Sequence, residues 1–224
     1  MKVLAIVGPT ASGKSDLAVK LAKQFDGEII SADSRQVYKG LDIGTGKITK
    51  REMKGVPHHL LDVAKLSNRP SGSITRFTVA DYQKLAQAKI AEITDRRHLP
   101  IICGGTGLYI QAALGELNIP PVPPDLKLRQ KLVKKPAAEL FKLLLKLDPT
   151  RTINIDRHNP RRLIRAIEIT QHFKLTGGQT SFFNKRGVIL DKHGTFWIGL
   201  KPEKEILRQK IRQRLERRLK QGLI

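Results

Sequence analysis

A glycine-rich segment near the start of the chain could bind phosphate groups. Residues 8–15 read Gly-Pro-Thr-Ala-Ser-Gly-Lys-Ser and match the pattern G-x-x-x-x-G-K-[ST] without a gap. The glycines allow backbone N–H groups to converge on phosphate oxygens, and a helix that begins at this loop adds positive potential. Lys14 would place its ammonium on a terminal phosphate, and the Ser15 hydroxyl could hold Mg²⁺. The motif therefore predicts a bound diphosphate or triphosphate.

Two kinds of reaction fit such a loop. A kinase breaks a P–O bond at the γ-phosphate of a nucleotide, whereas a prenyl transferase breaks a C–O bond and releases diphosphate. Both reactions build negative charge on phosphate oxygens, which the same loop would stabilise. The motif therefore indicates nucleotide or diphosphate binding and leaves the reaction open.

Two further polar groups follow apolar segments of the chain. Asp33 comes directly after residues 28–32, and Thr106 comes shortly after residues 100–103. Three roles stay open for Asp33: a Mg²⁺ ligand, a general base, or a cap of the next helix. Thr106 could equally cap a helix at a tight glycine turn.

Elements of an α/β fold must position these groups. Strand and helix patterns alternate in the first half, at residues 3–7 (strand), 14–25 (helix), 28–32 (strand), 78–93 (helix) and 100–103 (strand). Residues 39–75 are expected to be irregular. The alternation predicts a P-loop NTPase-like core with a parallel sheet. Ligands bind beyond the carboxyl ends of such strands, so Asp33 and Thr106 should face Lys14.

A proline-rich seam at residues 120–124 begins a segment of different character. The later patterns are helices at 126–133, 137–147 and 161–172, a loop at 174–191, a strand at 195–200 that should bury Trp197, and a helix opened by Pro202. Apolar residues recur every four positions in that last helix and predict a stripe facing the core: Leu207, Ile211, Leu215 and Leu219. We therefore predict a core of residues 1–119 and 193–224 with a small, basic helical insertion at 120–192.

The charge of the chain indicates an anionic partner. Lys and Arg number 42 against 20 Asp and Glu, a net charge of +22. Residues 1–124 hold 17 basic and 11 acidic residues, whereas residues 125–224 hold 25 and 9. Such a field favours nucleic acid or an anionic membrane face, although the solvated surface of a thermophile protein is an alternative. The single cysteine excludes an internal disulfide, and a cytoplasmic protein is expected.

Several segments, in this order, make the chain resemble the bacterial tRNA dimethylallyltransferase family, also called tRNA isopentenyltransferases. They are GPTASGKS (8–15), ADSRQVYKGLDIGTGK (32–47), PHHLLDV (57–63), FTVADYQ (77–83), GGTGLYIQA (104–112) and RRLIRAIEI (161–169). The resemblance implies a monomeric enzyme that uses Mg²⁺ and transfers a dimethylallyl group from dimethylallyl diphosphate. The acceptor would be N6 of adenine 37 in the anticodon loop of a tRNA.

The resemblance also implies a role for particular residues. Asp33 would be the general base, and Lys14 and Thr106 would act beside it on the substrates. The diphosphate would contact Gly8, Pro9, Thr10, Ala11, Ser12, Gly13, Lys14 and Ser15. The tRNA would contact Asp33, Ser34, Arg35, Gln36, Thr106, Arg129, Arg161, Arg162, Leu163, Ile164 and Arg165.

The chain departs from the family pattern in two places. It ends before the family's C-terminal segment, so we expect a fragment, and its helical insertion is short. Three alternatives stay open at this stage. They are a P-loop small-molecule kinase, a prenyl transferase that acts on free adenine nucleotides, and a nucleic-acid-binding module whose phosphate loop is vestigial.

Overall fold

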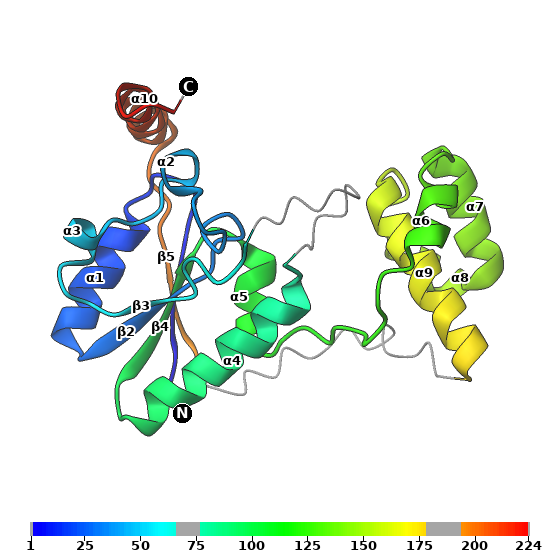
Figure 1. The fold of residues 1–224 in the computed structure, drawn as a ribbon, viewed down its shortest axis with the longest axis horizontal. Helices are drawn as coiled ribbons and strands as arrows, with labels where there is room; N and C mark the ends of the chain where they lie inside the picture. Colours follow the sequence, from blue (N-terminus) through cyan, green and yellow to red (C-terminus); the bar gives the residue numbers. More distant parts are fainter. Residues whose placement is uncertain (1, 66–76, 178–193, 224) are drawn as a thin grey trace. The chain divides into compact units, whose positions relative to one another are not determined.

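The computed structural model describes residues 2–65, 77–177 and 194–223. The chain divides into two compact units, Met1–Leu117 with Ile189–Ile224, and Asn118–Val188. The first unit holds a sheet with helices on both faces, and the second is built from helices (Figure 1).

The sheet of the first unit is parallel, as predicted. Its strand order is β3-β2-β4-β1-β5, and every neighbouring pair runs parallel. The strands are β1 (Leu4–Val7), β2 (Gly27–Ser31), β3 (His58–His59), β4 (Leu99–Gly104) and β5 (Phe196–Gly199). The central strands are buried along almost their whole length, because helices cover both faces of the sheet.

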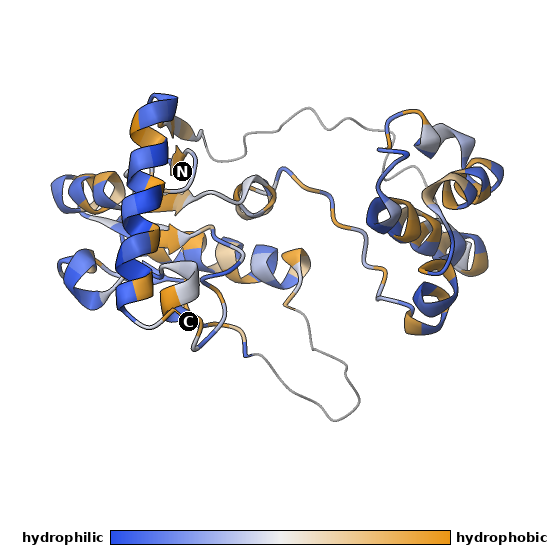
Figure 2. Ribbon diagram, turned by 90° about the horizontal axis from the view of Figure 1, so that it is seen from above, coloured by the Kyte–Doolittle hydropathy of each residue, from blue (hydrophilic) through white to orange (hydrophobic). Residues whose placement is uncertain are grey.

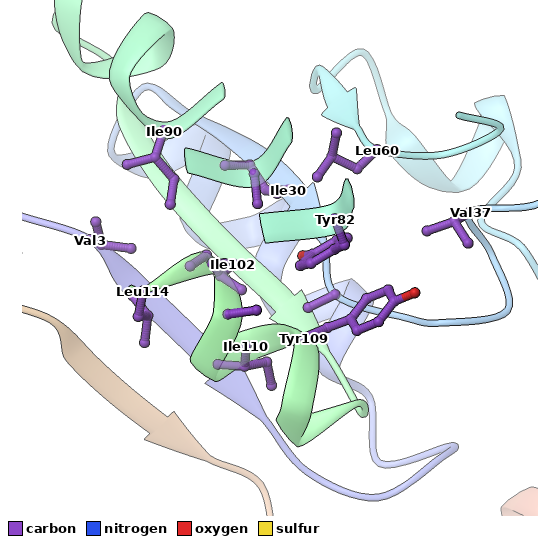
Figure 3. Close-up of a cluster of buried hydrophobic side chains, with 14 of the residues drawn as sticks. Val3, Ile30, Val37, Leu60, Tyr82, Ile90, Ile102, Tyr109, Ile110 and Leu114 are labelled. Carbon is purple, nitrogen blue, oxygen red and sulfur yellow. The ribbon is translucent and has the colours of Figure 1, made fainter. Parts of the chain in front are cut away.

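Alternate residues of the strands build two separate cores. Ile29 and Ile101 face helix α1 (Lys14–Gln24), where they pack against Val19. Their neighbours Ile30 and Ile102 face the opposite side of the sheet. There they pack against α4 (Val79–Asp95) and α5 (Gly107–Ala113) (Figure 3). The two layers hold the carboxyl ends of β1, β2 and β4 side by side.

Two tyrosines anchor the second of these cores. The rings of Tyr82 and Tyr109 stack with their centroids 4.0 Å apart (Figure 3). The buried hydroxyl of Tyr82 donates to the carbonyl oxygen of Ser31 at 3.0 Å. This bond ties α4 to the last residue of β2, directly before the segment that carries Asp33.

The prediction of an irregular segment at residues 39–75 is wrong for part of its described residues. Helices α2 (Asp42–Thr45) and α3 (Lys50–Met53) lie there, together with β3. Each helix is a single turn, too short for a periodic pattern to reveal. Helix α3 is stabilised locally by a capping box between Thr49 and Glu52.

The last helix, α10 (Lys204–Lys220), forms near its predicted position, but its apolar stripe does not face a core. Exposed fractions are 44% for Ile211, 49% for Leu215 and 45% for Leu219. Trp197 of β5 is 45% exposed, so its predicted burial is also wrong. Strand β5 lies at the sheet edge, and no helix among the described residues packs extensively on this stripe. Figure 2 shows α10 as largely hydrophilic with interspersed apolar residues.

The second unit contains the predicted helices. They are α6 (Leu126–Leu132), α7 (Ala137–Leu147) and α9 (Pro160–Thr176), and the short α8 (Pro149–Thr152) forms in addition, without having been predicted. Leu140 and Leu144 of α7 pack against Leu163 and Ile167 of α9. Helix α9 continues four residues beyond its predicted end, and most of the predicted loop that follows lies outside the described residues.

Candidate active site

The phosphate-type loop lies between β1 and α1 and has the backbone geometry that its glycines permit. Gly13 precedes the helix in the left-handed region, with φ 91°. At Gly8 a Cβ atom would lie 2.7 Å from the carbonyl oxygen of Leu200, so only glycine fits between the two segments. The loop therefore turns tightly and leads into the first N–H groups of α1, a position suited to an anion.

Lys14 folds back over this loop. Its Nζ donates to the carbonyl oxygen of Pro9 at 2.6 Å. Burial and the nearby Arg214 guanidinium lower the pKa of Lys14, whereas Cys103 and Asp33 act in the opposite direction. The ammonium is thus partly desolvated and close to another cation, which favours a bound anion.

Asp33 and Thr106 lie at the carboxyl ends of neighbouring strands, as the strand order requires. Oδ1 of Asp33 accepts the backbone N–H groups of Arg35 at 2.8 Å and of Gln36 at 3.4 Å. Among the described residues, every hydrogen bond to the Asp33 carboxylate falls on Oδ1. The carboxylate is therefore held by one oxygen and keeps the other for a ligand.

Thr106 binds the same segment from the side of β4. Its Oγ1 accepts the N–H of Ser34 at 3.1 Å, and its own N–H donates to the carbonyl oxygen of Ala32 at 3.2 Å. Gly104 permits this close approach, because a Cβ there would overlap the backbone carbonyl of Ala32. Thr106 thus fixes the turn that carries Asp33.

A cavity of about 560 Å³ joins the loop and Asp33. The predicted residues in its wall are Thr10, Ala11, Ser12, Gly13, Lys14, Ser15, Asp33, Arg35 and Gln36. Gly8, Pro9, Ser34 and Thr106 are not part of the wall and contribute through the backbone and hydrogen bonds behind it. The predicted juxtaposition of phosphate loop and carboxylate is therefore present.

Helix α10 supplies cavity residues that were not predicted from the sequence. Lys210, Arg214, Arg217 and Arg218 line the wall. Arg214 donates to the carbonyl oxygen of Gly46 at 2.9 Å, and Arg218 donates to that of Gly44 at 3.2 Å. Their helical spacing marks one basic face, a signal present in the sequence. That spacing does not reveal which site the face meets.

The charge of the cavity suits a multiply charged anion. Its wall contains six cationic side chains, from Lys14, Arg35 and four residues of α10, against three carboxylates, from Asp16, Asp33 and Glu52. Burial and Arg214 lower the pKa of Arg218, as expected for like charges held together. A bound diphosphate would relieve that repulsion.

The donor set of the cavity fits Mg²⁺ better than a metal held by protein alone. No cluster of three or more His, Cys, Asp or Glu side chains occurs within the described ranges. The exposed Ser15 hydroxyl and the Asp33 carboxylate line the same cavity. Mg²⁺ is commonly held by one or two protein oxygens together with substrate phosphates, so the Ser15 hydroxyl would suffice beside a diphosphate, with the Asp33 carboxylate nearby.

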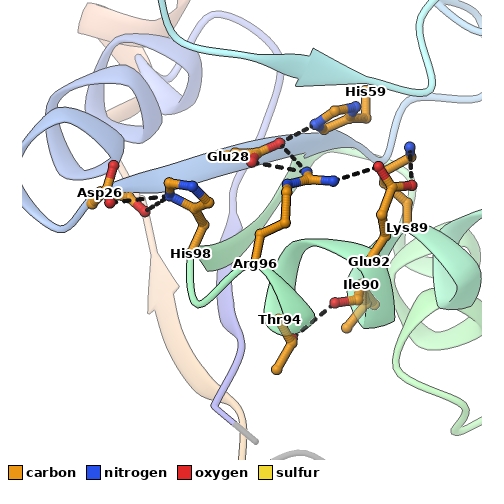
Figure 4. A network of polar contacts seen from close by, with 9 residues as sticks. All are labelled: Asp26, Glu28, His59, Lys89, Ile90, Glu92, Thr94, Arg96 and His98. Atoms are coloured by element: carbon orange, nitrogen blue, oxygen red, sulfur yellow. Dashed lines mark hydrogen bonds and ion pairs between the residues drawn. The ribbon is translucent and has the colours of Figure 1, made fainter.

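His58 and His59, the two residues of β3, make contacts that hold the surrounding structure. His59 Nε2 lies 2.6 Å from Oε2 of the buried Glu28. Nη2 of Arg96 donates to both oxygens of the same carboxylate at 2.9 Å (Figure 4). His58 Nδ1 lies 2.9 Å from the carbonyl oxygen of Val56, and burial lowers the pKa of His58. Both rings are thus engaged in holding the segment around β3.

The other predicted contact residues belong to the second unit. Arg161 and Arg162 are exposed at the start of α9 and line a second cavity of about 730 Å³ with Arg165. Leu163 is fully buried and Ile164 is 9% exposed, so both side chains stabilise the helical core. Arg129 and Arg165 both bind the carboxylate of Glu168.

Known proteins match the chain over nearly its whole length. The family model described as IPP transferase matches residues 36–224. The tRNA dimethylallyltransferase of Pediococcus pentosaceus is 44% identical over 226 residues, which cover 99% of this chain and 69% of that protein. The enzyme of the same name from Anoxybacillus flavithermus is 43% identical, over 100% of this chain and 68% of that protein.

Solved structures agree with these matches. The full-length tRNA isopentenylpyrophosphate transferase from Bacillus halodurans matches with a TM-score of 0.63 and 40% identity, over 99% of this chain and 67% of that one. A eukaryotic dimethylallyltransferase acting on tRNA matches with a TM-score of 0.81 and 28% identity, over 99% of this chain and 53% of that one. Within the described ranges, no helix combines the length and apolar character needed to cross a membrane.

Proposed function

The chain belongs to the IPP transferase family, and on that premise we propose that it transfers a dimethylallyl group from dimethylallyl diphosphate to N6 of adenine 37 in a tRNA. The observation that carries the proposal is the shared cavity in which the phosphate loop and Lys14 lie beside Asp33. Because tRNA would be the substrate, we expect the enzyme to act in the cytoplasm.

The phosphate loop would bind the diphosphate of the donor. The first N–H groups of α1 and the Lys14 ammonium would contact its oxygens, and Arg214, which lines the same cavity, would share the charge. These groups stabilise the charge that develops as the C–O bond breaks and diphosphate leaves. Mg²⁺, held by Ser15 and with Asp33 nearby, would neutralise further charge on the diphosphate when bound.

Asp33 would act as the general base. The N6 amine of adenine is a weak nucleophile, and its attack on the dimethylallyl carbon leaves a cationic nitrogen. The Asp33 carboxylate would take the N6 proton as the new N–C bond forms. The backbone N–H groups of Arg35 and Gln36 fix Oδ1, which supports a defined orientation of Oδ2 toward the substrate.

The basic second unit would bind the tRNA backbone. Arg161, Arg162 and Arg165 line one cavity of that unit, and guanidinium groups suit phosphate oxygens. The target adenine lies in a single-stranded loop, so moving it out of the stack costs only about a few kcal/mol. Affinity for tRNA should therefore fall steeply with salt.

The other functions considered from the sequence are not favoured. A small-molecule kinase or a transferase of free nucleotides would have no need of the basic helical unit. The matched relatives, at 44% and 43% identity, are tRNA dimethylallyltransferases.

The test is product formation. The chain is incubated with dimethylallyl diphosphate, Mg²⁺ and an unmodified tRNA that carries adenines at positions 36 and 37. The digested tRNA is analysed by mass spectrometry for N6-dimethylallyl-adenosine. We expect this product from the wild type. ATP turnover without prenylated tRNA would contradict the proposal.

A further inference from the structure

A buried carboxylate lies among the basic residues of the second unit. The side chain of Glu168, on α9, is 1% exposed. Its Oε1 accepts Nε of Arg129 at 2.8 Å and the backbone N–H of Asp125 at 2.7 Å. Its Oε2 accepts Nη2 of Arg129 at 2.7 Å and Nη1 of Arg165. One carboxylate thus binds two arginines from different helices.

The contacts compensate the burial of this charge. Burial favours the protonated acid, but the hydrogen bonds from Arg129, Arg165 and the Asp125 N–H hold the pKa of Glu168 below its usual value. The Arg129 pair is bidentate, the geometry that fixes both the position and the plane of a guanidinium. Glu168 is therefore ionised and holds Arg129 in one orientation.

The same contacts leave part of each arginine side chain accessible. The side chains of Arg129 and Arg165 are 35% and 33% exposed. Arg165 is fixed a second time, because its Nη2 donates to the carbonyl oxygen of Val122 at 2.8 Å. It also lines the cavity of this unit with Arg161 and Arg162. A fixed arginine loses less side-chain entropy on binding a phosphate than a free one.

We propose that Glu168 is a positioning residue for RNA binding, which fixes Arg129 and Arg165 so that the accessible parts of these two side chains meet phosphate groups of the tRNA. The inference rests on the proposed function, since it names how part of the basic unit would contact that substrate. Glu168 itself touches no substrate in this arrangement.

The direction in which Glu168→Gln changes tRNA affinity distinguishes this role from simple electrostatic attraction. Glu168→Gln removes a negative charge from a basic surface, so long-range attraction alone predicts tighter tRNA binding. Loss of the positioning contacts predicts weaker binding. Glu139→Gln is the matched control, because Glu139 lies on α7 of the same unit, is 55% exposed and pairs only with Lys135 in the described residues.

The experiment measures tRNA affinity by fluorescence anisotropy at several salt concentrations, without the prenyl donor, and checks folding by circular dichroism and thermal unfolding. We expect Glu168→Gln to weaken binding by about tenfold, and Glu139→Gln to leave it unchanged or slightly tighter. A folded Glu168→Gln protein that binds as tightly as the wild type, or more tightly, overturns the inference.

A second variant keeps the test decisive if Glu168→Gln unfolds. Arg129→Lys preserves the charge but loses the bidentate contact, so we expect weaker binding again, whereas unchanged affinity overturns the inference. A wild-type chain that binds no tRNA would overturn the proposed function as well. That outcome is distinct from selective failure of the Glu168 comparison.

Discussion

Arg214 donates a hydrogen bond to the carbonyl oxygen of Gly46 at 2.9 Å, across 168 residues of sequence. Gln36 donates to the same oxygen at 3.4 Å. The α2 turn therefore connects helix α10 to the segment that carries Asp33. This connection brings the basic face of α10 to the phosphate loop.

The first prediction concerns Gly46→Ala. Gly46 has φ +59°, and a Cβ there would overlap the guanidinium groups of Arg214 and Arg218. Both arginines must move, so the KM for dimethylallyl diphosphate should rise by about tenfold. The left-handed strain should also lower the free energy of unfolding by about 1 kcal/mol.

Gly55→Ala is the control for that strain. Gly55 has φ +83°, and a Cβ added there would meet no heavy atom within 4 Å, so the substitution adds strain without a clash. It should reduce stability similarly and leave the KM unchanged. Equal KM values for the two variants would show that α10 has no part in donor binding. Steady-state kinetics and urea unfolding measure both effects.

The second prediction concerns Asp33→Asn. Asparagine keeps the side-chain oxygen that accepts the N–H groups of Arg35 and Gln36, so the turn should persist. It cannot take the N6 proton, and kcat should fall by about 10² to 10⁴. Rapid-quench measurement of prenylated tRNA, alongside tRNA binding, provides the readout.

The exposed Asp95→Asn is the matched charge control for this variant and should keep full activity. Parallel loss of tRNA binding and of turnover in Asp33→Asn would indicate that Asp33 supports the structure of the site. In that case Asp33 would not be the general base of the reaction.

The phosphate loop and Asp33 could be located from the sequence because that side of the site depends on local rules. The loop pattern located Lys14 and Ser15, and the position of Asp33 after a strand located it at the ligand-binding edge. The parallel sheet followed from alternation of strand and helix patterns. The signals for the loop and for Asp33 are carried by residues adjacent in sequence to the group that they position.

Contacts between distant segments could not be predicted in this way. A helical period shows which residues of α10 share a face, but not what the face meets. The sequence therefore predicts that the apolar stripe faces a core, although Leu215 is 49% exposed, and it does not place Arg214 in the cavity that it lines. Similarly, the spacing of Arg165 and Glu168 allows an i,i+3 pair, but Arg129 is 39 residues away from that acid.

The third prediction concerns pH and Lys14. Its pKa lies below the usual 10.5, mainly because of burial. The ammonium is therefore lost as pH rises through this lowered value, and affinity for inorganic diphosphate should fall at a lower pH than for an ordinary lysine. Isothermal titration calorimetry across alkaline pH measures the effect.

Lys14→Arg supplies the comparison for that titration. Arginine stays charged across this range, so the affinity of Lys14→Arg for inorganic diphosphate should not fall at alkaline pH, even if it is reduced at neutral pH. Parallel pH profiles for the wild type and Lys14→Arg would assign the loss to another group.

The last prediction concerns the acid stability of the first unit. Glu28 is buried on β2. Its carboxylate forms an ion pair with Arg96, at the end of α4, and a hydrogen bond with His59 of β3 (Figure 4). Burial opposes its ionisation, but the hydrogen bonds from Arg96 and His59 prevail and lower the pKa of Glu28 from 4.5. A lowered carboxyl pKa adds stability above pH 4.5, and that stability is lost as pH falls through the folded-state value.

Glu28→Gln should therefore lower the free energy of unfolding by about 3 kcal/mol at neutral pH, and the difference from the wild type should shrink on acidification. Urea unfolding between neutral and acidic pH tests this expectation, with the exposed Glu92→Gln as control. Glu92 binds the same Arg96 at the surface, where water screens the pair, so its loss should change stability far less. The contribution of Glu28 can depend on pH only if its carboxylate ionises. If the difference in free energy of unfolding between the wild type and Glu28→Gln stays constant with pH, Glu28 stabilises the strands through packing alone.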